Sequence, residues 1–293
     1  MKEKDFIIAT ASTCDLDKDW LDRHHVPMIS YTFEIDGRIF IDDCRRDTRH
    51  QTYQAMREDK MPNTSQITEY NYYVFFEDMI RSGNDIIFAD MSRAVSGSYF
   101  NSLRAADQIR EDYPDARITI LDTRCITTGL GYLIRQMVYM HEAGNSYDEI
   151  VQWAEENERK IVHRFMVDDL KWLRKGGRLS NASAIVGSLL SIKPLICLAE
   201  DGSLVAYEKV RGRKKAVKAL LDSTEEDNAA CPITDIILSH SDCLEEGRQW
   251  MAMVKERYPN ANVSLQELGP VIGAHIGPGF LSIVYISDTR RIS

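Results

Sequence analysis

The sequence predicts an α/β protein of two domains, in which the N-terminal sheet is mostly parallel with flanking helices and the C-terminal sheet is mixed. Three observations support this prediction. Short apolar runs alternate with helix-length segments along nearly the whole chain. Several of these runs are continuously apolar, as expected for strands covered on both faces. The chain has 293 residues, more than the roughly 100 to 200 of one domain.

Four apolar runs are the clearest strand candidates, and they cover residues 6–9, 85–89, 117–121 and 235–238. Helical segments between them have recognisable ends. Ser146 and Glu149 form a capping-box pattern that opens a helix over residues 150–160. Gly83, Gly144 and Gly176 follow other helical segments and are expected to be C-caps.

Two Asp-Gly turns each join strand-like runs, so a hairpin is predicted at Asp36-Gly37 and another at Asp201-Gly202. The second would join residues 192–198 to 204–210 and make the C-terminal sheet mixed. No low-complexity linker marks a boundary. We place it where acidic sequence gives way to basic sequence, which divides the chain into residues 1–158 and 159–293, and either domain can be discontinuous.

Composition limits the location and the class of partner. The N-terminus runs from charged residues straight into a strand without a signal-peptide pattern, and no stretch approaches the roughly 18 apolar residues of a membrane span. A cytoplasmic protein is therefore predicted. The six cysteines are scattered without a CxxC pair, so we expect them to be reduced and structural.

The charge distribution is uneven. The net charge of −9 argues against nucleic acid as a partner, because phosphate binding needs a basic face. Residues 159–218 nevertheless hold fourteen Lys/Arg and five Asp/Glu, a local charge of +9, so the rest of the chain carries −18. Such a segment fits docking to an acidic protein, transient contact with an anionic membrane surface, or a solvated basic face.

Four polar segments follow strands or begin helices, where open α/β sheets bind ligands; they are residues 11–13, 63–66, 95–99 and 269–279. Ser96 precedes a run of apolar residues at helical spacing and is predicted to be an N-cap, a position that favours an anion. His275 is the only titratable side chain in the fourth segment, which is rich in glycine and proline and is predicted to be a loop.

Other motifs carry less weight. Gly129 and Gly131 lack the third glycine of a dinucleotide fingerprint and lie in a helical pattern. The stretch from Ser239 to Asp242 offers triad residue types as immediate neighbours, whereas a triad is assembled from separate parts of a fold. His240 and Cys243 lack a second pair of metal ligands. The chain has neither a phosphate-binding glycine loop with a lysine nor a metal-binding acidic cluster, so we expect no ATP site. No metal and no cofactor are predicted.

These segments, in their order along the whole chain, resemble the signature blocks of the DegV family of bacterial fatty-acid-binding proteins. The blocks are Thr64-Ser65-Gln66, Ser96-Gly97-Ser98-Tyr99, Asp122-Thr123, the run from Val167 to Ser180 (VDDLKWLRKGGRLS), Ile192-Lys193-Pro194, Arg211-Gly212-Arg213-Lys214-Lys215-Ala216, and Gly269 to Gly279 (GPVIGAHIGPG). One departure is the first block, where the family usually has Asp between Thr and Ser and this chain has Ala11.

The resemblance implies two α/β domains with one long-chain fatty acid in a tunnel between them. By position, its carboxylate would meet Thr64, Ser65, Ser96, Gly97 and His275. Ser12, Gly273 and Gly277 would flank the site, and Arg178, Arg211 and Arg213 would face a partner.

That partner would be the ATP-binding subunit of a fatty acid kinase, which phosphorylates the presented carboxylate to an acyl phosphate. The chain itself would then be a carrier and hold no catalytic residue. Neutral donors and an imidazole suit this role, because a strong arginine clamp would lower the nucleophilicity of the carboxylate. Two alternatives are a regulatory lipid sensor and a serine hydrolase with Ser96 as nucleophile and His275 as base.

Overall fold

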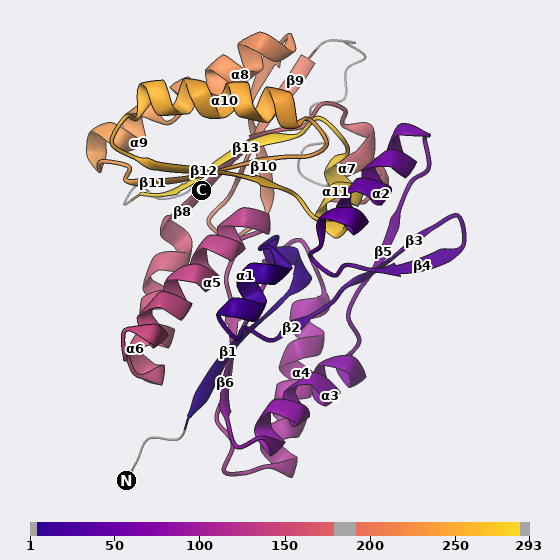
Figure 1. The fold of residues 1–293 in the computed structure, drawn as a ribbon, viewed down its shortest axis with the longest axis vertical. Coiled ribbons are helices and arrows are strands. Elements are labelled where there is room, and N and C mark those ends of the chain that lie inside the picture. The colour runs from indigo at the N-terminus through magenta and orange to yellow at the C-terminus, as the bar shows by residue number, and fades with distance from the viewer. Residues whose placement is uncertain (1–4, 179–191, 288–293) are drawn as a thin grey trace.

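A four-stranded parallel sheet forms the centre of the N-terminal half in the computed structural model, which describes residues 5–178 and 192–287 (Figure 1). Its strand order is β2 (Met28–Ile29), β1 (Phe6–Ala11), β6 (Asp85–Asp90) and β7 (Ile118–Asp122). Every residue of β6 is buried, as expected for a central strand covered on both faces. The three strands predicted here, and their parallel pairing, are confirmed.

Two pairs of helices flank this sheet (Figure 1). One pair is α3 (Glu69–Arg81) with α4 (Ser98–Asp112), and the other is α5 (Thr127–Glu142) with α6 (Tyr147–Asn157). The predicted capping box opens α6, since Ser146 and Glu149 each accept a hydrogen bond from the other's backbone N–H. The helix begins three residues earlier than predicted, and Glu158–Lys160 form the separate 3-10 turn η2.

The predicted C-cap glycines divide into two kinds. Gly83 and Gly144 take left-handed φ angles of 91° and 89° just beyond α3 and α5, which glycine adopts without steric cost. Gly176 caps the short helix α7 (Lys171–Lys175) with an ordinary φ of −71°, and it is Gly177 that turns left-handed.

A six-stranded mixed sheet forms the C-terminal half. Its strand order is β10 (Leu204–Arg211), β9 (Ile192–Leu198), β8 (Ile161–Met166), β13 (Leu281–Ile286), β11 (Asp235–His240) and β12 (Asn262–Glu267). Only the pair β11 and β12 is parallel among these. The predicted hairpin at Asp201-Gly202 is confirmed as the antiparallel pair β9 and β10.

Helices α8 (Arg213–Asp222), α9 (Glu225–Ala230) and α10 (Leu244–Arg257) accompany this second sheet, and α8 and α10 lie over its outer side (Figure 1). Helix α5 meets both sheets, because it contacts β1 and β6 as well as β8, β11 and β13. The apolar core therefore runs from the first sheet through α5 to the inner face of the second.

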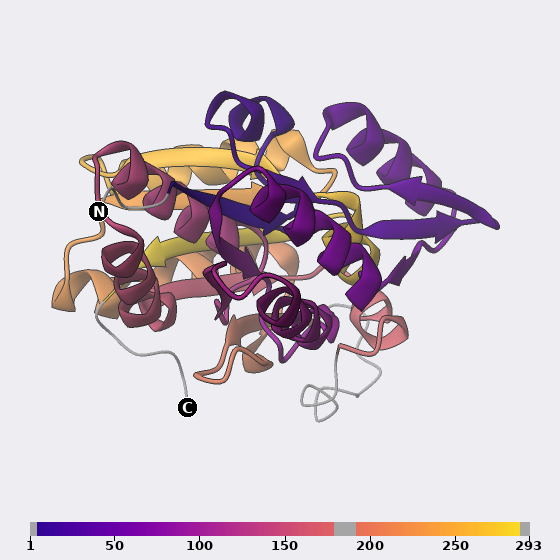
Figure 2. The same ribbon diagram turned by 90° about the horizontal axis from the view of Figure 1, so that it is seen from below.

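A small antiparallel sheet, β4-β3-β5, extends to one side of the molecule with α2 (Arg46–Arg57) (Figure 2). Strands β3 (Thr32–Ile35) and β4 (Arg38–Ile41) form the predicted first hairpin, where Asp36 and Gly37 both have positive φ. Strand β5 (Asn63–Ser65) pairs with β3, and two short elements, η1 (Ser12–Cys14) and α1 (Lys18–Arg23), follow β1.

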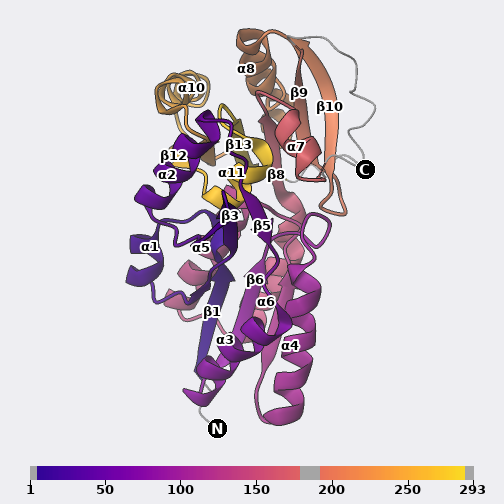
Figure 3. The same ribbon diagram turned by 90° about the vertical axis from the view of Figure 1, so that its right-hand side faces the viewer.

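Helix α11 (Pro270–Ile276) connects the halves, since it contacts α2, β3 and β5 of the N-terminal half and α7 of the C-terminal half (Figure 3). The boundary at residue 158 stays a prediction; the first strand of the second sheet begins at Ile161. None of the six cysteines forms a disulfide. Within residues 5–178 and 192–287, no helix has the length and apolar character that a membrane crossing requires.

Candidate ligand-binding site

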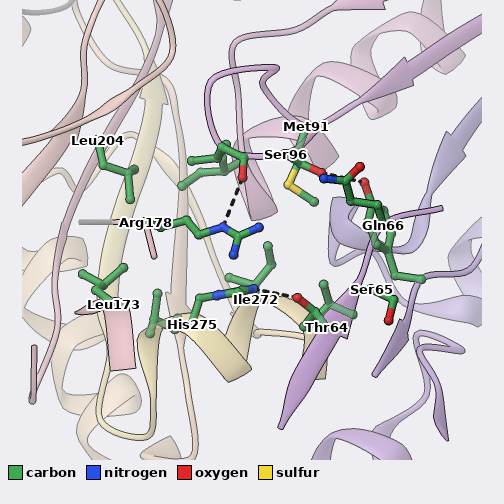
Figure 4. Close-up of a pocket in the computed structure, with 15 residues that line it drawn as sticks. Thr64, Ser65, Gln66, Met91, Ser96, Leu173, Arg178, Leu204, Ile272 and His275 are labelled. Carbon is green, nitrogen blue, oxygen red and sulfur yellow. Dashed lines mark hydrogen bonds between the residues drawn. The ribbon is translucent and has the colours of Figure 1, made fainter. Parts of the chain in front are cut away.

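A cavity of about 630 Å³, including the space at its mouth, lies where the two halves meet. Its walls come from segments far apart in sequence, namely Tyr31, Thr64, Ser65, Gln66, Met91, Val95, Ser96, Ile126, Leu173, Arg178, Leu204, Val271, Ile272, His275 and Ile276. The polar side chains gather together, with apolar ones around them (Figure 4).

Thr64 and His275 meet across the cavity (Figure 4). Strand β5 presents Thr64, and its Oγ1 lies 2.9 Å from Nε2 of His275 in the last turn of α11. Burial, with the nearby charge of Arg178, lowers the pKa of His275 to about 4, so the imidazole is neutral at pH 7. Its Nδ1 is buried without a hydrogen-bond partner among the described residues. His275 can therefore act as a neutral donor or acceptor.

The segment around His275 is a helix and not the loop that its glycines and proline predict. Pro270 occupies the first helical turn, where its missing N–H costs nothing, and Gly277 ends the helix with a φ of 75°. Glycine is required by close packing at two further points. A Cβ on Gly273 would lie 2.7 Å from the Tyr53 hydroxyl, and one on Gly277 would lie 2.1 Å from the Trp172 ring.

Arg178 reaches into the cavity from the end of the segment after α7 (Figure 4). Its Nε donates to the carbonyl oxygen of Val95 at 3.3 Å, and its Nη1 donates to the carbonyl oxygen of Gly176. Burial lowers the pKa of its guanidinium group, and no carboxylate among the described residues forms an ion pair with it. A half-buried cation without an acidic partner is a natural site for an anion.

Ser96 lies between the end of β6 and the start of α4, and only 8% of it is exposed. The prediction that it is the N-cap is wrong by one residue, because Gly97 holds that position and the helix begins at Ser98. The hydroxyl of Ser96 still accepts the N–H of Ser98 at 3.2 Å, so it performs the capping contact. Its other neighbour is the Tyr31 hydroxyl, 3.4 Å away.

The other predicted site residues lie around this group. Ser65 lines the cavity from the exposed edge of β5. Gly97 does not line it but leaves room for Gln66, whose Nε2 would lie 2.6 Å from a Cβ there. Ser12 is fully buried outside the cavity, where its Oγ accepts the N–H of Tyr31 at 3.1 Å.

Two arginines predicted to face a partner lie away from the cavity. Arg211 is exposed at the end of β10. Arg213 pairs within the chain, with Asp168 at 3.0 Å and Glu246 at 2.7 Å. Their role toward a partner stays a prediction. Leu179 and Ser180, the last two residues of the block VDDLKWLRKGGRLS, lie outside the described residues, as does part of the basic segment 159–218.

The triad-like stretch does not form a catalytic arrangement. His240 ends β11 with 2% of its surface exposed, and burial lowers its pKa to about 4. Asp242 pairs with Arg57 at 2.8 Å, and the Ser241 hydroxyl donates to the carbonyl oxygen of Gly277. Within the described ranges, no three His, Cys, Asp or Glu side chains are grouped as metal ligands would be.

Two buried carboxyl groups lie beneath the start of α11. Asp15 accepts the N–H of Gly269 at 2.8 Å, and Asp42 accepts the N–H of Cys44 at 3.3 Å. Each is 1% exposed and keeps one oxygen without a hydrogen-bond partner among the described residues. Burial raises the pKa of Asp15 to about 8 and that of Asp42 to about 7, although the Arg49 charge opposes both shifts.

The fold and the cavity together define a class: α/β proteins with a pocket between two sheets that suits an anionic head and an apolar body. The chain belongs to the DegV family, whose model, described as one of uncharacterised proteins, matches residues 5–288. A DegV domain-containing protein of Clostridium perfringens is 37% identical over 289 residues, which cover 98% of this chain and 99% of the relative.

Two solved structures illustrate the shared fold. A DegV family protein from Thermus thermophilus, described for its fatty acid binding, has a TM-score of 0.86 and 26% identity, with 97% of this chain and 99% of that chain covered. The Fak B3 protein of the Streptococcus pneumoniae fatty acid kinase, loaded with linoleic acid, has a TM-score of 0.83. It is 21% identical, with 97% of this chain and all of that chain covered, and this likeness shows the fold alone.

Proposed function

We propose that this chain binds one long-chain fatty acid in the cavity between its two sheets. The carboxylate would lie among Thr64, Ser65, Ser96, His275 and Arg178. The guanidinium group departs from the expected set of neutral donors, but its Nε and Nη1 already donate to backbone carbonyl oxygens, so it would act as a nearby charge and not as a bidentate clamp. Gly97 would contribute through its packing against Gln66. The observation that carries the proposal is the Arg178 guanidinium, which faces the cavity beside hydroxyl groups without an acidic partner among the described residues. The fatty acid binding of the Thermus thermophilus relative supports the same ligand class.

The apolar part of the cavity suits an acyl chain. Its wall includes Met91, Ile126, Leu173, Leu204 and Ile272, which belong to both halves of the chain. Burial of a methylene group contributes about 0.8 kcal/mol, so some fifteen methylenes would contribute about 12 kcal/mol before the costs of association. The carboxylate is the harder part to bury, and it needs the donors and the cation gathered at Ser96, His275 and Arg178.

The proposal includes a partner. The likeness of fold to a protein of a fatty acid kinase supports a carrier that presents its ligand to a separate ATP-binding subunit. The kinase would phosphorylate the carboxylate, and this chain would supply no catalytic group and no cofactor. A cytoplasmic location and transient contact with an anionic membrane surface through the basic segment fit this role and stay predictions.

Two other functions compete with this one. A serine hydrolase would need His275 to take the proton of Ser96, but Nε2 of His275 contacts Thr64, and its Nδ1 has no described carboxylate to orient the ring. A lipid sensor would use the same pocket without a kinase. Capture of the kinase subunit from the same organism by this chain would favour the carrier.

Native mass spectrometry of the purified protein tests the ligand. We expect a mass excess that corresponds to one fatty acid per chain, because the tail contributes enough free energy for the ligand to survive purification. Lipid extraction under denaturing conditions would then identify the acyl length. A protein that is empty and also fails to bind added oleate or palmitate would contradict the proposal.

Alanine variants of Ser96 and His275 test the link to the kinase. Each is expected to lose acyl phosphate formation in a reaction with the kinase subunit, ATP and oleate, because each removes a group that holds the carboxylate for attack. Acyl phosphate can be trapped with hydroxylamine and counted. Ser102→Ala in α4, a buried serine away from the cavity, is the matched control. Normal turnover by both variants would exclude the assigned site.

A further inference from the structure

A buried carboxylate lies directly behind the pocket. Asp90, the last residue of β6, is 1% exposed and accepts four hydrogen bonds. Its Oδ1 accepts the N–H of Met91 at 2.6 Å and the hydroxyl of Thr13 at 3.1 Å. Its Oδ2 accepts the hydroxyls of Tyr31 at 3.0 Å and Tyr72 at 2.8 Å. Burial raises the pKa of Asp90, and these four donors oppose that shift.

Tyr31 connects Asp90 to the pocket. It lines the cavity, and its oxygen lies 3.4 Å from that of Ser96. A tyrosine hydroxyl has one proton, and the shorter, charge-assisted contact with Asp90 takes it. Burial and the charge of Asp90 raise the pKa of Tyr31 well above its ordinary value, so the proton stays on the phenolic oxygen. Tyr31 therefore faces Ser96 as an acceptor.

We propose that Asp90 is a positioning residue for the carboxyl group bound in the pocket. By engaging the Tyr31 proton, Asp90 presents the Tyr31 oxygen as an acceptor toward the pocket. Ser96 then receives no proton from Tyr31 and is the hydroxyl of this pair that donates. This inference rests on the proposed fatty acid ligand. Nothing in it requires Asp90 to touch the ligand.

The arrangement affects the protonation of the ligand. An acceptor oxygen backed by a negative charge favours the neutral carboxylic acid, whereas Arg178 favours the carboxylate. The charged or titratable groups that face Asp90 or the cavity are Tyr31, Tyr72, His275 and Arg178. Among the three side chains that donate to Asp90, only that of Tyr31 lines the cavity; Met91, which also lines it, donates its backbone N–H.

Oleate labelled with ¹³C at its carboxyl carbon tests the proposal, because its chemical shift reports protonation of the bound acid. In Asp90→Asn, the amide oxygen keeps the Met91 contact, the amide NH₂ faces Tyr31, and the Tyr31 proton turns toward Ser96. We expect the bound acid to titrate about one pH unit lower than in the wild type. Tyr31→Phe removes the acceptor, so it should shift the titration in the same direction even if Asp90→Asn does not fold.

Two control variants distinguish the proposed effect through Tyr31 from a general disturbance of the fold around Asp90. Tyr72→Phe removes a donor from the same Asp90 oxygen without lining the cavity, and Asp85→Asn changes a buried aspartate at the other end of β6. Both should titrate as the wild type does. The double variant of Asp90 and Tyr31 should shift no further than Tyr31→Phe alone.

Three results would count against the assignment. A folded Asp90→Asn protein that binds oleate with the wild-type titration curve overturns it. Additive shifts in the double variant overturn the path through Tyr31. A wild-type protein that holds no oleate overturns the proposed function itself, and this assignment with it.

Discussion

Replacement of Arg178 by glutamine is expected to weaken oleate binding roughly 30-fold or more. The reason is that the pocket would lose the guanidinium that faces it, while the carboxylate would still have to leave water. Isothermal titration calorimetry on delipidated protein would measure the change. Arg178→Lys should restore part of the affinity, because lysine supplies the charge without the planar geometry.

Arg174→Gln is the matched control, since it removes the same charge from the exposed face of α7. Equal affinities of the Arg178 and Arg174 variants would place Arg178 outside the head-group site. Normal oleate affinity of Arg178→Gln combined with failure of acyl phosphate formation would instead support the predicted role toward the partner.

The unfolding free energy is expected to fall as pH rises from about 4 to about 8. The folded protein keeps protons on Asp15 and Asp42, with pKa values of about 8 and about 7, whereas the unfolded chain releases them near the ordinary value of 3.8. Between these limits the native state binds more protons, so each group lowers stability by up to about 1.4 kcal/mol per pH unit. Urea titrations at pH 5, 6, 7 and 8 would measure the slope.

Asp15→Asn should flatten this slope, because an amide cannot ionise. Asp19→Asn, an exposed substitution on α1, should leave it unchanged. A protein whose stability rises between pH 5 and pH 8 would show that these carboxyl groups are ionised in the folded state.

The sequence was sufficient for the parts of the fold that depend on local patterns. The strand at Asp85–Asp90, the two Asp-Gly hairpins and the Ser146 capping box are all present, because apolar runs, turn chemistry and caps act over a few residues. Local patterns misled at α11. Its glycines and proline resemble a loop, whereas close packing against Tyr53 and Trp172 requires small residues within and after a short helix.

The site was predicted in part, by motif more than by chemistry. Thr64, Ser65, Ser96 and His275 do line one cavity. Tyr31 was missed, because nothing in its local sequence indicates that the residue just before β3 lines the pocket. The cavity position of Arg178 also depends on how α7 packs against α11, which sequence spacing cannot give.

Ala11 is a further position whose neighbours could not be predicted from the sequence. Strands β1 and β6 pair Thr10 with Ala89, so Ala11 lies beside Asp90. A carboxylate from the neighbouring strand is therefore present at the level of the sheet where the family usually has aspartate in the first block. Strand register, which the sequence alone did not provide, reveals this relation.

The pocket has a consequence for synthesis of the protein. Its wall begins with Tyr31 and is completed only by Val271 to Ile276 on α11. A chain growing from its N-terminus on the ribosome therefore cannot enclose a ligand until nearly all of the second sheet has emerged. Until then the apolar wall residues of the first half have no partner surface, so a molecular chaperone or the ligand itself would meet them before the fold is complete.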